Sequence, residues 1–274
     1  MGQADELPPK IRALLDIVRI NAPLIMLFEG WLDRFLEWGI QPEIGFDWRA
    51  LDIPRKDLKM MARRMAGAGL RTTAHGPFMD LASGARDPLI LKISRERYAR
   101  ALEAAALFSP AYMVFHPSYE KAHHTYYRSE WLETNLETWR TVIHRADDLG
   151  IRAILENTYE TGPFELEPLL AGLAADGVGF CLDFGHAQAF GETDITVWLQ
   201  TLAPYLEVLH LHDNNGDCDE HLALGAGRID FRAYLTWLVE RDIRPSITLE
   251  PHHEEHLWPS LSTLADLWPW HLPT

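Results

Sequence analysis

The chain has 274 residues, 47% of them hydrophobic, and a formal net charge of −15 at pH 7. Such a charge argues against a general attraction to nucleic acid or to an anionic membrane surface. No apolar run approaches the roughly 18 residues of a membrane span, and MGQADELPPK does not resemble a signal peptide. Two cysteines, Cys181 and Cys218, provide no disulfide framework, so we expect a cytoplasmic protein of enzyme size.

Strand-like and helix-like segments alternate along the chain after a lead-in over residues 1–10. Short apolar runs bounded by turn residues predict strands, and longer runs with apolar residues at helical spacing predict helices. The predicted strands cover residues 18–22, 42–46, 71–75, 111–115, 152–155, 178–182, 208–211 and 246–249. The predicted helices cover residues 24–39, 55–68, 93–108, 129–149, 166–175, 195–203, 231–240 and 261–268.

Several details of the connections can also be predicted. The segments GPFMDLASGARDPLIL (76–91) and PHHEEHLW (251–258) are expected to be loops, and Ser129 is expected to cap the helix that it begins. Gly225 and Gly227 are assigned to a tight loop, because they lack the strand and helix of a dinucleotide-binding turn.

Eight strand–helix units without an obvious linker predict a single-domain (β/α)8 barrel over residues 1–274. An open doubly wound sheet is the alternative. Such a sheet would normally carry a glycine-rich phosphate-binding turn after its first strand, and none is present.

Residues of metal-ligand type follow six consecutive predicted strands, at the end of the barrel where active sites lie. Carboxylate oxygens and imidazole nitrogens suit zinc, manganese or iron. Any one of them alone would more often be a structural hydrogen-bonding residue, but their clustering indicates a metal site. The set comprises His75, His116, Glu156, Asp183, His186, His210, Asp219, His221 and Glu250.

The ordered motifs HGPF, VFHP, ILEN, CLDFGH, LHLHDNNGDCDEH and TLEP resemble those of the xylose isomerase-like barrel superfamily. This superfamily contains sugar isomerases, epimerases and the endonuclease IV type of apurinic-site nuclease. The nuclease pattern implies that all nine residues bind three zinc ions. The isomerase and epimerase pattern implies one divalent metal on Glu156, Asp183, His210 and Glu250, with both glutamates moving the substrate proton and His186 contacting substrate.

Charge and loop composition favour different members of this superfamily. Four carboxylates around one divalent ion leave a local charge of about −2, and around three ions about +2, which suits an anionic phosphate. The ligand number therefore favours a multinuclear site and phosphoester hydrolysis. In contrast, the mouth loops are poor in Arg and Lys, and HLHDNN stands where the nuclease pattern reads HLNDSK, which resembles the isomerase branch.

We therefore predict a divalent-metal isomerase or epimerase acting on a small sugar or sugar phosphate. Glu156 and Glu250 would perform the acid–base work beside a metal-polarised carbonyl. The alternatives are a di- or trinuclear zinc phosphodiesterase resembling endonuclease IV, and a barrel that only binds a ligand through a residual metal site. The predicted cofactor is zinc or manganese, in two or three ions.

The predicted partner is a small sugar or phosphorylated molecule, with no nucleic acid and no membrane, and the oligomeric state is left open. His212 shares a strand face with His210 and is predicted to hydrogen-bond it or to contact substrate. Trp48 and Trp258, in the mouth loops, are predicted to stack on a sugar ring or base.

Overall fold

Eight parallel strands form the centre of the structure, a computed structural model that describes residues 7–272. They close into a barrel in sequence order, with β8 paired to β1. The strands are β1 (Arg19–Pro23), β2 (Gln41–Gly45), β3 (Thr73–His75), β4 (Tyr112–Phe115), β5 (Arg152–Glu156), β6 (Gly179–Asp183), β7 (Leu206–Leu211) and β8 (Ser246–Leu249). The predicted (β/α)8 barrel is confirmed, and the open sheet is excluded.

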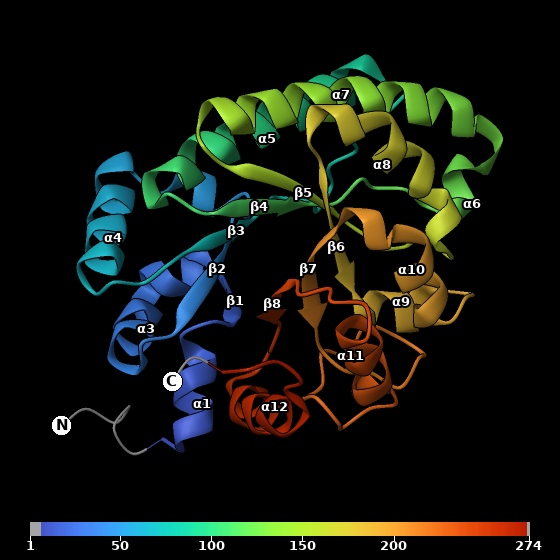
Figure 1. The fold of residues 1–274 in the computed structure, drawn as a ribbon. Helices are drawn as coiled ribbons and strands as arrows, with labels where there is room; N and C mark the ends of the chain where they lie inside the picture. The colour runs from blue at the N-terminus through green and yellow to red at the C-terminus, as the bar shows by residue number, and fades with distance from the viewer. Residues whose placement is uncertain (1–6, 273–274) are drawn as a thin grey trace.

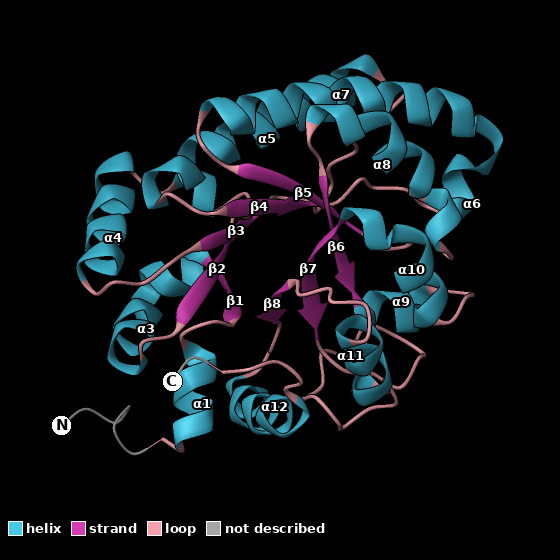
Figure 2. Ribbon diagram, in the orientation of Figure 1, coloured by secondary structure: helices cyan, strands magenta, loops and turns pink. Residues whose placement is uncertain are grey.

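Helices surround the strands on the outside of the barrel (Figures 1 and 2). They are α1 (Pro9–Leu15), α2 (Leu24–Met26), α3 (Leu32–Trp38), α4 (Arg55–Gly67), α5 (Pro88–Ala105), α6 (Lys121–His124), α7 (Arg128–Asp148), α8 (Glu167–Leu173), α9 (Phe184–Phe190), α10 (Ile195–Leu202), α11 (Phe231–Val239) and α12 (Glu254–Leu267). A π turn, Leu27–Trp31, joins α2 to α3. Within residues 7–272, no helix has the length and apolar character needed to cross a membrane.

Several helices begin at positions that differ from those predicted. Helix α5 starts at Pro88 rather than at residue 93, because the Asp87 side chain accepts hydrogen bonds from the N–H groups of Leu89 and Ile90. The loop predicted over 76–91 is correspondingly shorter. Helix α7 starts at Arg128, so Ser129 lies inside it and does not cap it.

The two ends of the chain also depart from the prediction. Of the lead-in expected over residues 1–10, residues 1–6 lie outside the described range, and α1 begins at Pro9 with a proline in its first turn. Helix α12 begins at Glu254 rather than at residue 261, so most of the loop expected over 251–258 is helical. Trp258 is therefore a helix residue.

The barrel wall is buried on both faces, as in other parallel sheets with helices outside and side chains inside. Every residue of β4 and β6 is buried. The helices complete the outer core with large side chains such as Trp139 and Trp198, both fully buried. Such packing fixes the strand ends rigidly, and the side chains that project from those ends form the site.

Candidate metal centre

The structure brings all nine predicted ligand residues together at the C-terminal mouth of the barrel. His75, Glu156 and Asp183 are the last residues of β3, β5 and β6, and His210 lies in β7. The others directly follow a strand or lie in the loop and helix beyond it; they are His116, His186, Asp219, His221 and Glu250. Side chains from six strands therefore converge on one place, and they fall into three neighbouring groups.

The first group joins β3, β4 and β5 through three side chains. The Nε2 atoms of His75 and His116 each lie 3.1 Å from Glu156 Oε2, and 3.1 Å from each other. His75 Nδ1 donates to the carbonyl of Gly76 at 2.9 Å, which leaves the lone pair of a neutral His75 ring at Nε2. Two imidazole nitrogens and a carboxylate oxygen in such contact suit a shared cation.

The second group uses the other oxygen of the same glutamate. Glu156 Oε1 lies 3.1 Å from His210 Nδ1, and Glu250 Oε1 lies 3.0 Å from that nitrogen. Asp183 adjoins this group, and its buried Oδ2 has no hydrogen-bond partner among the described residues. Glu156 therefore belongs to two groups at once, one through each carboxylate oxygen.

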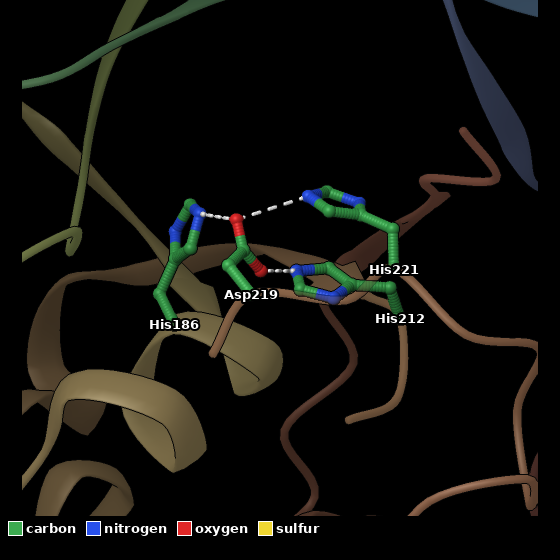
Figure 3. A group of neighbouring side chains, drawn as sticks. All are labelled: His186, His212, Asp219 and His221. Atoms are coloured by element: carbon green, nitrogen blue, oxygen red, sulfur yellow. Dashed lines mark hydrogen bonds and ion pairs between the residues drawn. The ribbon is translucent and has the colours of Figure 1, made fainter. Parts of the chain in front are cut away.

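The third group surrounds Asp219, in the loop after β7 (Figure 3). Asp219 Oδ2 lies 3.5 Å from His186 Nε2 and 3.1 Å from His221 Nε2. Both imidazoles donate from Nδ1 to a backbone carbonyl, His186 to Asn157 at 2.9 Å and His221 to Glu250 at 3.0 Å. Hydrogen bonds of this kind fix the ring orientation and leave Nε2 free for a metal.

Local structure explains how the chain presents these groups. Asp183 caps α9, a helix that the sequence did not predict, by accepting a hydrogen bond from the N–H of His186 at 2.6 Å. Asp183 is therefore both the last residue of β6 and the residue whose carboxylate fixes the start of α9. His221 has a φ of 49°, in the left-handed region that few residues other than glycine occupy, although histidine does so more often than most.

The loop that carries Asp219 and His221 is fixed by a residue to which the sequence analysis gave no role. Asp213 is fully buried, and its carboxylate accepts backbone hydrogen bonds from Gly225 and Gly227, both at 2.9 Å, and from Ile229 at 3.1 Å. A side chain on Gly227 would approach Asp213 Oδ1 to 2.3 Å, which explains the second glycine of the LGAGR loop.

Glu43 is a second residue that the sequence analysis missed. It is fully buried inside the barrel, its Oε2 accepts from the hydroxyl of Thr248 at 3.0 Å, and its Oε1 lies 3.1 Å from His210 Nε2. The available signal was a charged residue inside the otherwise apolar strand PEIGF. This carboxylate is placed to orient His210, whose Nδ1 faces Glu156 and Glu250.

The charge balance of the site supports a metal. Burial alone would raise the pKa of Glu156, but His210 and His116 hold it well below its usual value. Burial likewise disfavours a charge on His186, but Asp183, Asp219 and Glu156 raise its pKa well above normal. The carboxylates thus require positive charge beside them, which divalent cations supply when they displace protons from ligands.

The mouth opens into a cavity of about 760 Å3. Its walls carry the aromatic and apolar residues Trp48, Phe78, Met79, Tyr159 and Phe190, and two arginines, Arg49 and Arg97. Trp48 is 64% exposed and lies where the sequence places it, at the mouth.

Trp258 and His212, the other two predicted substrate contacts, are not among the residues that line this cavity. Trp258 is on α12, its ring centroid lies 4.7 Å from that of Trp38, and it is not among the residues that line the cavity. This placement argues against substrate contact and follows from the early start of the helix. His212 is only 2% exposed and packs behind the third group, stacked on His221 at 3.8 Å between ring centroids.

Comparison with known proteins identifies the family. The family model for the xylose isomerase-like TIM barrel matches residues 34–267. The chain belongs to this family. Among curated proteins, it is 29% identical to uncharacterized protein MJ1311 of Methanocaldococcus jannaschii over 202 residues, 71% of this chain and 69% of that protein. A probable endonuclease 4 of Mycobacterium leprae is 25% identical over 189 residues, 63% of this chain and 70% of that protein.

Solved structures of this family are similar over nearly the whole chain. The TTHB071 protein from Thermus thermophilus, solved after soaking with ZnCl2, is 30% identical with a TM-score of 0.78, and the match covers 91% of this chain and 97% of that one. A D-tagatose 3-epimerase-like protein is 23% identical with a TM-score of 0.80, and the match covers 92% and 97% of the two chains. The latter similarity concerns the fold alone. The chain therefore resembles an epimerase-like protein in its fold and a probable endonuclease 4 at low sequence identity.

One buried carboxyl group outside the ligand set yields a prediction about stability. Glu160, in the loop after β5, is fully buried; its Oε2 accepts from the N–H of Thr158 at 2.6 Å, and its Oε1 has no partner among the described residues. Burial raises the pKa of Glu160 from 4.5 to about 8. Between these values the unfolded chain releases a proton that the folded chain keeps, so the free energy of unfolding should fall by up to about 1.4 kcal/mol per pH unit as pH rises.

Glu160→Gln should remove much of this pH dependence while keeping the size of the side chain. Urea unfolding at pH 5 and at pH 8, with a chelator present to exclude metal effects, measures it. Glu133→Gln, an exposed change on α7, is the matched control and should retain the wild-type slope. Equal slopes in wild type and Glu160→Gln would show that the buried carboxyl does not control the dependence.

Proposed function

We propose that this protein is a multinuclear divalent-metal hydrolase that acts on small phosphate esters. The sequence favoured an isomerase or epimerase first, and the geometry around Glu156 is our reason for proposing the reverse order. The observation that carries the proposal is the contact of Glu156 Oε2 with His75 and His116 while its Oε1 faces His210. A single-metal isomerase site needs neither histidine as a metal ligand.

The donor set fits two or three ions, zinc or manganese. His75, His116 and Glu156 would hold one position. Glu156, Asp183, His210 and Glu250 would hold a second, and His186, Asp219 and His221 a third. When bound, such ions lower the pKa of water and offset the negative charge of a phosphate.

The chain's own residues would bind and orient the substrate. Arg49 and Arg97 line the same cavity as His75 and His116 and would supply donors for phosphate oxygens, although Arg49 Nε already donates to Asp47 at 2.9 Å. Trp48 and Phe78 offer apolar faces against which the organic part of the phosphate ester, the alcohol leaving group, could pack. Two arginines and a net charge of −15 are too little positive charge to grip duplex DNA, so a small ester is favoured.

A substrate panel tests the proposal. Protein loaded with zinc or manganese should hydrolyse simple aryl phosphodiesters or phosphomonoesters, and chelation should abolish the reaction. Binding to an abasic DNA duplex should be weak, with a shallow dependence on salt because few phosphates are neutralised. Protein that carries two or more ions yet cleaves no ester in the panel would refute the proposal. Tight binding to the duplex with a steep salt slope, together with nicking, would instead indicate a nuclease.

A sugar isomerase or epimerase remains the second candidate, and one observation favours it. Glu156, at the end of β5, and Glu250, after β8, approach the same nitrogen of His210 at 3.1 Å and 3.0 Å, and Asp183, on the neighbouring strand β6, is paired with His210. These four residues could hold one ion without help from the other groups. The two glutamates would then move a proton on the carbon next to a polarised carbonyl.

A further inference from the structure

His212 is a buried imidazole whose nitrogens lack hydrogen-bond partners. It follows β7, is 2% exposed, and neither Nδ1 nor Nε2 has a hydrogen-bond partner among the described residues. A buried polar group left unpaired costs roughly 1–3 kcal/mol. Asp219 Oδ1, close by, also lacks a partner. The unpaired His212 Nε2 and the unpaired Asp219 Oδ1 are therefore neighbours in the same small space.

The distances from the Asp219 carboxylate to the three imidazoles are close to those between neighbouring ligand atoms of a tetrahedral metal site. His212 Nε2 lies 3.5 Å from Asp219 Oδ1 and 3.2 Å from Asp183 Oδ1. One ligand atom from each of His186, His212, Asp219 and His221 lies within 4.8 Å of the other three. In a tetrahedral zinc site with bonds of about 2.0–2.2 Å, neighbouring ligand atoms are roughly 3.3–3.6 Å apart. Figure 3 shows the three imidazoles arranged around the carboxylate of Asp219.

The backbone of α9 is shaped to admit this ring. A Cβ atom on Gly185 would lie 1.9 Å from His212 Cε1 and 2.3 Å from both ring nitrogens. No other residue could occupy position 185 without moving the imidazole. On its other face, the ring stacks on His221 with an angle of 13° between the planes. The glycine of CLDFGH and the stacked ring therefore hold His212 in one orientation.

We propose that His212 is a fourth protein ligand of the third ion, together with His186, Asp219 and His221. Three imidazoles and one carboxylate fill the four positions of a structural zinc, so that this ion has no position open for substrate or water. It anchors the loop after β7, and the substrate binds at the groups that share Glu156. This inference rests on the multinuclear centre of the proposed function. It limits the ions that contact substrate to the two whose ligands include Glu156.

Ion retention tests the assignment without reference to turnover. Zinc-loaded wild type, His212→Asn and Gly185→Ala are dialysed against chelators of increasing strength, and zinc per chain is measured by elemental analysis. Wild type should retain one ion more than either variant. The affinity for that ion should fall by at least about 100-fold, since loss of even an outer-shell partner costs about 10–100-fold. His144→Asn, an exposed histidine on α7, should behave as wild type.

Each outcome decides the assignment. Equal ion counts and affinities in wild type and His212→Asn would overturn it, as would a zinc-bound crystal structure with His212 Nε2 beyond about 3 Å from any ion. The Gly185→Ala variant keeps the imidazole and displaces it, so loss of the ion in this variant as well would show that the position of the ring, and not only its presence, holds the ion. Full ion retention without any phosphate ester hydrolysis would count against the proposed function and leave the role of His212 intact.

Discussion

Replacing Glu156 with glutamine should release more than one metal ion and lower kcat/KM by roughly 100- to 1,000-fold, the scale of losing a central electrostatic group. Its two carboxylate oxygens face different groups, Oε2 toward His75 and His116 and Oε1 toward His210. An amide has only one oxygen to offer, and its NH2 repels a cation. Loss of this single charge therefore weakens two positions together.

Elemental analysis and steady-state kinetics on the same sample check this expectation. Glu133→Gln on the exposed face of α7 controls for the loss of one negative charge. A thermal melt with and without zinc separates metal loss from misfolding, because wild type should be stabilised by the ions and Glu156→Gln much less. A Glu156→Gln protein that keeps all of its ions would show that the shared carboxylate is not the link between the groups.

The barrel could be predicted from sequence because eight short, mostly apolar segments alternate with segments of helical spacing. The positions of the strand ends also predicted that the ligand residues meet at one mouth of the barrel. His75, His116, Glu156 and Glu250 each stand at or directly after the end of a strand. Strand ends are fixed by the sheet, so their side chains can be placed without knowledge of the loops. Their roles as ligands remain a proposal.

Features that depend on contacts between distant segments could not be predicted. Glu43 acquires its place from Thr248, more than 200 residues away, and from His210. The Asp213 carboxylate accepts hydrogen bonds from the N–H groups of Gly225 and Ile229, 12 and 16 residues further along the chain. These hydrogen bonds in turn stabilise the loop between Asp213 and the two donors. Some predicted helix boundaries were wrong for local reasons. The cap at Asp87 lets α5 begin earlier in the chain than predicted, and the early start of α12 makes Trp258 a helix residue away from the mouth.

Replacing Glu250 with glutamine should lower turnover by about 100-fold or more, the scale for loss of a positioned general base, with folding largely retained. Glu250 directly follows β8, and its Oε1 lies 3.0 Å from His210 Nδ1. Burial favours the neutral acid, but His210 holds the pKa of Glu250 well below its usual value, so the group is an anion at neutral pH. Glutamine keeps the size and removes both the charge and the basicity.

The two candidate functions require different roles of this glutamate. A hydrolase needs it only to hold a cation, so ketoses and their phosphates should exchange no carbon-bound hydrogen with deuterated solvent, in wild type or variant. An isomerase or epimerase needs it also to exchange a proton with substrate carbon, so solvent deuterium should enter the sugar in wild type and not in Glu250→Gln. Metal content is measured on each sample, because the substitution weakens ion binding in both cases. Deuterium incorporation that vanishes in a variant with its ions retained would reverse the order of the two functions proposed here.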